Sequence, residues 1–125
     1  PRRADQASER VRLHLQQAQP AWPDLGHTAA ALHMAASTLQ RRLAADGTSY
    51  QALKDALRRD LAIVRLNTST APLAALAEEL GFADSAAFQR AFKHWTGSAP
   101  GAYRRRGLGA DEDGSGSMQA PRLPD

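Results

Sequence analysis

Two short stretches of this sequence place a glutamine directly before an arginine, first at Gln40-Arg41 and again at Gln89-Arg90. Arginine can donate two hydrogen bonds to O6 and N7 of guanine, and glutamine can bind N6 and N7 of adenine in the same two-bonded way. Because an α-helix fits the major groove of B-DNA, a helix that exposes this pair can reach base edges. The alternative is the ordinary solvated face of an amphipathic helix. Repetition of the pair at matched positions favours DNA.

Both pairs lie on segments with the apolar periodicity of a helix. In "LGFADSAAFQRAFKHWTG", residues 80–97, Phe88, Phe92 and Trp95 recur at helical spacing. A predicted helix over 36–45 carries Leu39 and Leu43 in the same way. We expect these apolar faces to form a core rather than a platform on which bases stack. The opposite faces of the two helices carry Ser37, Gln40, Arg41, Ala44, Ala86, Gln89, Arg90 and Lys93.

Helical periodicity dominates the rest of the chain as well, and strand signals are nearly absent. A first helix is predicted to end at Pro20 and Pro23, and its apolar stripe is Ala4, Ala7, Val11, Leu15 and Ala18. A long helix capped by Ser49 has the stripe Tyr50, Leu53, Leu57, Leu61 and Val64. Further helices are expected to begin at Asp24, at Pro72, at Asp84 or Ser85, and at Pro100.

The two halves of the chain align with one another at an offset of about fifty residues. Two copies are too few for a solenoid, which needs at least about three stacked repeats. We therefore predict an all-α fold of about seven helices, with two helix-turn-helix units joined by a linker helix. The predicted boundaries are 5–48 for the first unit, 49–67 for the linker helix and 70–106 for the second unit.

The turn of each unit has its own residue at the aligned position, Gly81 in the second and His33 in the first. Gly81 can adopt the left-handed conformation that a tight turn between helices needs. Histidine is among the residues enriched at positive φ. Two interpretations of His33 stay open at this stage, a turn residue at positive φ and a partly buried histidine. Four scattered histidines do not indicate a metal site.

The linker helix sets the expected distance between the two units. About seventeen residues at roughly 1.5 Å per residue give a length of about 25 Å. With the radii of the units added, the two polar helix faces are expected about 34 Å apart, which is one turn of B-DNA. The chain is then predicted to read an asymmetric, bipartite DNA site as a monomer.

Charge and composition fit a nucleic-acid partner. Residues 1–106 hold fifteen Lys and Arg against nine Asp and Glu, and fourteen of the sixteen basic residues of the chain are Arg. A genome rich in G and C is an alternative source of this arginine bias. The chain has no cysteine and no long apolar run, so disulfides, thiolate sites and a membrane span are not expected. It begins at Pro1, which suggests a piece of a longer protein, and 107–125 is predicted to be a disordered tail rich in acid, Gly and Ser.

Residues 6–106 resemble the AraC/XylS family of bacterial transcription regulators. The most specific part is "LAEELGFADSAAFQRAFKHWTGSAPGAYR", which is similar to the second helix-turn-helix of the family and its closing Gly-x-Ser-Pro-x-x-Tyr-Arg signature. The resemblance implies a seven-helix C-terminal DNA-binding domain, usually attached to an N-terminal domain for effector binding or dimerisation. RNA polymerase is a further expected partner.

By position, the resemblance assigns residues of both units to DNA contacts. The base-reading residues it implies are Ser37, Gln40, Arg41, Ser85, Ala86, Gln89 and Arg90. The phosphate contacts it implies are Arg42, Ser49, Lys93 and Arg104, together with the helix N-termini near Ser49 and Pro100, where free N–H groups face an anion.

The sequence departs from the family pattern at several places. His33 stands where a small turn residue is common. Ala99 replaces a capping serine before the last helix, and Ala35 lacks the hydroxyl that commonly caps the earlier recognition helix. Ala86 and Ala87 are too short for hydrogen bonds to bases. They can pack against a thymine methyl group, or they leave the second unit weakly specific.

The function expected from these observations is a sequence-specific transcription regulator that binds double-stranded DNA in the cytoplasm, at the nucleoid, without a cofactor. A helical protein-interaction module whose basic face is incidental is the alternative from another class. An enzyme is not expected, because no Gly-x-Ser-x-Gly, His-Glu-x-x-His or phosphate-loop motif is present.

Overall fold

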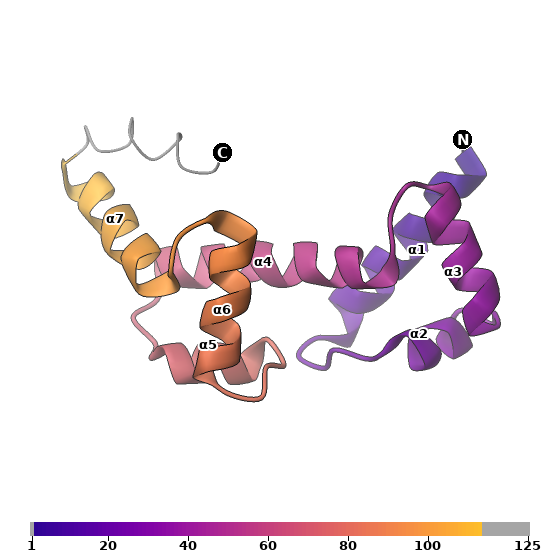
Figure 1. Ribbon diagram of the computed structural model, residues 1–125, viewed down its shortest axis with the longest axis horizontal. Helices are drawn as coiled ribbons and strands as arrows, with labels where there is room; N and C mark the ends of the chain where they lie inside the picture. Colours follow the sequence, from indigo (N-terminus) through magenta and orange to yellow (C-terminus); the bar gives the residue numbers. More distant parts are fainter. Residues whose placement is uncertain (1, 114–125) are drawn as a thin grey trace. The chain divides into compact units, whose positions relative to one another are not determined.

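The computed structural model describes the backbone of residues 2–113 and the side chains of residues 7–106. Seven helices and no strand lie in this part of the chain (Figure 1), which confirms the expected all-α fold. The helices are α1 (Arg2–Ala18), α2 (Leu25–Ala31), α3 (Ala36–Ala45), α4 (Tyr50–Thr68), α5 (Leu73–Glu79), α6 (Ser85–Thr96) and α7 (Pro100–Asp113). No helix among the described residues is both long enough and apolar enough to span a bilayer.

The chain divides into two compact units, and the division falls inside α4, between Arg58 and Arg59. One unit contains α1, α2, α3 and the first half of α4, and the other contains the second half of α4 with α5, α6 and α7. Each unit therefore consists of three helices and a share of the linker helix.

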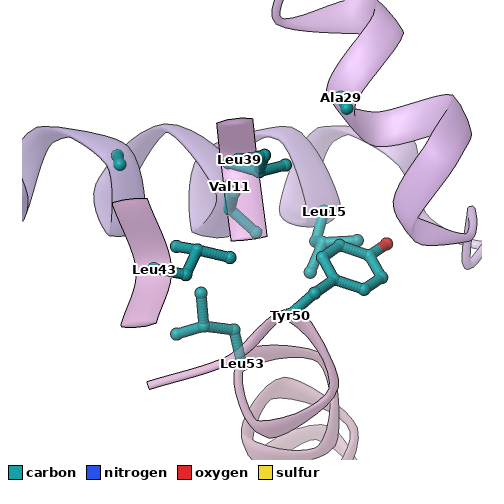
Figure 2. Close-up of a cluster of buried hydrophobic side chains, with 8 residues drawn as sticks. Val11, Leu15, Ala29, Leu39, Leu43, Tyr50 and Leu53 are labelled. Carbon is teal, nitrogen blue, oxygen red and sulfur yellow. The ribbon is translucent and has the colours of Figure 1, made fainter. Parts of the chain in front are cut away.

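The first unit has an aliphatic core. Its buried members come from four helices and are Ala7, Val11, Leu15, Ala29, Leu39, Leu43, Tyr50 and Leu53. Figure 2 shows Val11, Leu15 and Leu43 pointing toward Tyr50 and Leu53 at the start of α4. The stripe predicted for the first helix is confirmed at 7, 11 and 15, Ala18 is half-buried, and the Ala4 side chain lies outside the described residues.

Tyr50 also supplies the polar contact that closes this core. Its hydroxyl donates a hydrogen bond to the carbonyl of Pro23 and lies 3.0 Å from the hydroxyl oxygen of Thr28. Thr28 is completely buried, and a buried hydroxyl without a partner is costly. Burial raises the pKa of Tyr50, so the phenol stays a neutral donor at physiological pH.

The second unit has an aromatic core centred on α6. Phe88 and Phe92 are completely buried. The ring of Phe88 lies 5.7 Å from that of Phe82, and the ring of Phe92 meets Tyr103 of α7 edge-on at 5.4 Å. Trp95 adds a contact with Phe92 at 6.5 Å. These tilted and edge-on contacts are the geometries that aromatic rings favour, and they support the expectation that the large apolar residues of this segment are core.

The apolar stripe predicted for the linker helix is correct only in its first half. Tyr50 and Leu53 are buried, but Val64 is 53% exposed. In the second half of α4 the buried apolar residues are Ala62 and Leu66. The prediction continued one stripe along the whole helix, whereas α4 serves two separate cores and buries different positions in each.

The helices α2 and α5 each end in a turn of the same type. Met34 and Phe82 each donate their backbone N–H to the carbonyl five residues earlier, at 2.9 Å in both cases. This bond is typical of the Schellman motif, which needs a left-handed residue just before the donor. That residue is His33 with φ 62° in the first unit and Gly81 with φ 81° in the second. His33 is exposed, so the turn interpretation is confirmed and the partly buried one is wrong.

Three helix starts carry the predicted caps. Asp24 accepts the N–H of His27 at 2.9 Å, which lowers the pKa of Asp24, and Asp84 accepts the N–H of Ala87 at 2.8 Å. Ser49 accepts the N–H of Ala52 at 3.1 Å. Helix α3 follows Ala35 and has no side-chain cap, as its sequence indicates.

The last helix is longer than predicted. It continues to Asp113, so residues 107–113 of the expected disordered tail are helical in their backbone. Gly107 and Gly109 weaken a helix by about 1 kcal/mol each but do not end it, and Leu108 and Ala110 favour it. Residues 114–125 of the expected tail lie outside the described residues.

Arg104 attaches the last helix to the end of α4 and the loop that follows it. Its guanidinium donates to the carbonyl of Ala71 at 2.8 Å and to that of Leu66 at 3.4 Å. Leu66 belongs to the last turn of α4, where carbonyls lack helical partners and the helix dipole favours a cation. The side chain therefore serves the fold of the second unit.

His33 is strained by its backbone, and glycine at this position is expected to relieve that strain. A left-handed conformation costs a residue with a Cβ atom about 1–2 kcal/mol, of which the greater freedom of unfolded glycine cancels a part. We predict that His33→Gly raises the free energy of unfolding by about 0.5–1 kcal/mol in urea titrations. The converse change in the second unit, Gly81→His, should lower it. A destabilised His33→Gly variant would contradict this account.

Arg104 and its neighbour Arg105 form a matched pair for testing the internal role of Arg104. We predict that Arg104→Ala lowers the free energy of unfolding by about 1–3 kcal/mol, because it removes charged hydrogen bonds to two carbonyls. Arg105 is exposed and has no hydrogen bond or ion pair among the described residues, so Arg105→Ala should change stability by less than about 0.5 kcal/mol. Equal effects of the two substitutions on thermal unfolding would refute the role given to Arg104.

Candidate nucleic-acid interface

The aromatic core fixes which side of α6 faces outward. With Phe88 and Phe92 at 0% exposure, the other side presents Ala86, Arg90 and Lys93 as exposed residues. Ser85 and Gln89 lie one turn apart at the edge of this surface and are half-buried. The four base-reading residues predicted on this helix are thus brought together on α6, next to one of its predicted phosphate contacts.

Two of these residues contact one another directly. The side-chain amide of Gln89 donates a hydrogen bond to the hydroxyl of Ser85 at 2.9 Å. Asp84 caps the helix, so the hydroxyl of Ser85 is not needed for that purpose. This bond was not predicted from the sequence. The pattern that could have indicated it is a serine four residues before a glutamine on one helix, a spacing at which side chains meet.

Helix α3 also has one buried face and one exposed face. Leu39 and Leu43 are completely buried, while Gln40 and Arg41 are exposed. Ser37 is exposed on the first turn of the same helix. The three base-reading residues predicted in the first unit therefore all reach solvent from α3.

The outward-facing basic side chains of α3 and α6 differ from most other arginines in their bonding. Several arginines elsewhere have protein partners, and these are Arg10, Arg12, Arg58, Arg59, Arg65, Arg104 and Arg106. Within residues 7–106, by contrast, Arg41, Arg42, Arg90 and Lys93 have neither an ion pair nor a hydrogen bond to a side chain or carbonyl. Their positive charges are thus available to a ligand.

The predicted phosphate contacts fall into two groups. Arg42, Lys93 and Ser49 are exposed, and the hydroxyl of Ser49 already caps α4. Arg104 is half-buried, and its guanidinium is hydrogen-bonded to two carbonyls within the second unit. Its neighbour Arg105 is exposed and was not among the predicted contacts. In the run of three arginines, composition alone cannot tell which side chain faces the core, because consecutive helical residues point about 100° apart.

The N-terminus of α7 was also predicted to face an anion. The ring of Pro100 is buried, and the hydroxyl of Ser98 accepts a hydrogen bond from Arg106 at 2.9 Å. Tyr103 donates its N–H to the carbonyl of Ala99 at 2.9 Å, so the helix forms without a serine at that position.

Within the described part of the chain, no group of three His, Asp, Glu or Cys side chains is arranged to hold a metal ion.

One family model and several known proteins are similar to this chain. A family model described as a helix-turn-helix domain matches residues 28–106, more than half of the chain. The ornithine utilization regulator of Pseudomonas aeruginosa is 45% identical over 83 residues, which are 66% of this chain and 24% of that protein. The transcriptional regulator VqsM of the same organism is 34% identical over 96 residues, 77% of this chain and 30% of that protein. The chain thus spans less than a third of these relatives.

Solved structures give the same result. The transcriptional regulator CdpR of Pseudomonas aeruginosa superposes with a TM-score of 0.77 at 33% identity, over 79% of this chain and 31% of that one. The C-terminal domain of AraT, a response regulator of Geobacillus stearothermophilus, gives 0.73 at 27% identity, over 79% and 84%. These relatives are named as regulators, which confirms the expectation of a binding domain and not an enzyme. On the family match, the relatives and the fold together, the chain belongs to the AraC-type helix-turn-helix domains of transcription regulators.

Proposed function

We propose that this chain binds double-stranded DNA sequence-specifically, with α3 and α6 in two successive segments of the major groove. The observation that carries the proposal is a set of outward cations on these helices that have no ion pair or side-chain hydrogen bond within residues 7–106, namely Arg41, Arg42, Arg90 and Lys93. Leaving a charge without an internal partner suits a side chain whose partner is a polyanion. On each helix a glutamine directly precedes an arginine of this set, and it adds hydrogen bonding to base edges.

The base contact proposed for each residue follows from the chemistry of its side chain. Arg41 and Arg90 have the two-pronged donor geometry that O6 and N7 of guanine accept, while Gln40 and Gln89 suit adenine. Ala86 is exposed on α6, on the same face as Arg90, and offers a methyl group to the methyl of a thymine. Ser37 offers a single hydroxyl to a base of either kind.

Contacts to the sugar-phosphate backbone fix the register of each helix on the duplex. We assign these contacts to Arg42, Lys93 and the N-terminus of α4 at Ser49, and we add the exposed Arg105 in place of Arg104. These contacts carry no sequence information of their own, but they supply much of the affinity and make it depend on salt.

The whole protein is proposed to act as a transcription regulator at the nucleoid in the bacterial cytoplasm. An N-terminal domain that binds an effector or dimerises, and RNA polymerase, are the partners proposed for it. The chain spans only 24% and 30% of the two curated relatives, which is consistent with further parts of this kind.

Selection of binding sites from a random duplex library with the purified chain tests this proposal. Two enriched blocks about one helical turn, or roughly 10 base pairs, apart are expected if both helices read bases. A single block would restrict base reading to one unit. No enrichment over random DNA would contradict sequence-specific binding and would favour the protein-interaction module.

Arg41 and Arg90 should each govern one position of the selected site. We predict that Arg41→Ala and Arg90→Ala each cost about 1–3 kcal/mol in binding to the selected duplex and relax the preference at one base pair, a different one for each. The measurement is a fluorescence anisotropy titration against the site and its single-base variants. Arg59→Ala is the control, since Arg59 is exposed but bonded to Asp60. If Arg90→Ala weakens specific and random DNA equally, Arg90 is not a base reader.

Lys93 and Arg105 should act on every sequence alike. We predict that Lys93→Ala or Arg105→Ala weakens binding to selected and random duplexes by the same factor. Each should also reduce the slope of log affinity against log salt concentration by about 0.9, because one phosphate contact is lost. A titration from low to moderate salt measures the slope. An unchanged slope for Arg105→Ala would remove it from the interface.

A further inference from the structure

The hydrogen bond between Ser85 and Gln89 gives the two recognition helices unequal chemistry. Gln89 donates to the hydroxyl of Ser85 at 2.9 Å, one turn back along α6. Both side chains are half-buried, so the bond is partly sheltered from competing water. Asp84 supplies the helix cap, which leaves the hydroxyl of Ser85 free to accept.

The bond leaves on Gln89 the groups that adenine requires. A glutamine amide has two N–H donors and one oxygen acceptor. With one N–H given to Ser85, one N–H and the oxygen remain. These are the donor for N7 and the acceptor for the N6 amino group of adenine. Guanine presents two acceptors in the major groove and offers no donor to the glutamine oxygen.

The first unit lacks this arrangement. The residue four positions before Gln40 is Ala36, which has no hydroxyl. Ser37 is nearby on the same helix, but no hydrogen bond joins it to Gln40 in the described part of the chain. Gln40 therefore keeps its rotational freedom until it meets a ligand, whereas Gln89 is already oriented.

We infer that Ser85 is a positioning residue that orients Gln89 for adenine, so that α6 discriminates adenine at its glutamine position more strongly than α3 does. This inference rests on the proposed function and goes beyond it, because it moves Ser85 from a base contact to a residue that acts through Gln89. Ordering a flexible side chain during binding lowers affinity by about twofold to tenfold. Because the bond to Ser85 already orients Gln89, binding to DNA does not lose this affinity.

A double-mutant cycle on the full chain tests the inference. The variants are Ser85→Ala, Gln89→Ala and the double substitution, measured by anisotropy against the selected duplex and against duplexes with adenine replaced at the Gln89 position. We expect Ser85→Ala to reduce the preference for adenine by about twofold to tenfold with affinity for random DNA unchanged. In the Gln89→Ala background, Ser85→Ala should then have no effect.

The matched control uses the first unit, in which Ser37→Ala and Gln40→Ala should act independently. Thermal unfolding of Ser85→Ala is measured in parallel, and a loss of folding would move affinity for random DNA as well as base preference.

Three results would overturn the inference. One is a Ser85→Ala effect that persists undiminished in the Gln89→Ala background, which would make Ser85 a direct base contact. Another is an unchanged adenine preference in Ser85→Ala when Gln89→Ala loses it, which leaves the proposed function intact. Failure of the wild-type chain to prefer any sequence would instead contradict the proposed function, and the inference with it.

Discussion

The burial of Phe88 and Phe92 fixes the rotation of α6 about its own axis, and the outward chemistry of the helix depends on that rotation. Turning the helix by one residue, about 100°, would bring a polar side chain into the aromatic core and an aromatic ring into water. Each buried ring contributes about 1.5–3 kcal/mol against such a change. Leu39 and Leu43 do the same for α3. The positions of glutamine and arginine on each surface therefore follow from apolar packing on the other side.

The two units reach one geometry by different means. Their turns share a hydrogen bond of the same length, yet one uses a glycine at φ 81° and the other a histidine at φ 62°. The second unit packs aromatic rings on the inner face of α6, while the first relies on leucines and on the hydrogen bonds of Tyr50. Helix α6 has a side-chain cap and α3 has none. The first unit therefore has a strained turn residue and an uncapped helix start, where the second unit has a glycine and an aspartate cap.

Much of this could be predicted from the sequence, because helix stripes, caps and turns depend on neighbours along the chain. The caps of Asp24 and Ser49, the turn at Gly81 and the apolar faces of α3 and α6 were all predictable in this way. Errors arose where the fold decides between residues of the same type. Val64 was placed in a core, and the internal hydrogen bonds of Arg104 were not foreseen, because only tertiary packing selects which face of α4 or α7 turns inward. Which side chains of the site face outward likewise depends on tertiary packing and not on the local sequence.

Protection of guanine N7 from methylation by dimethyl sulfate reports directly on whether α3 and α6 contact bases, because N7 lies in the major groove. On the selected duplex, the account predicts protected guanines in two separate segments. The Arg41→Ala variant should lose protection in one segment only, and Arg90→Ala in the other only. Bound duplex with every guanine N7 still reactive would contradict the claim that α3 and α6 read bases, and would reduce the interface to its phosphate contacts.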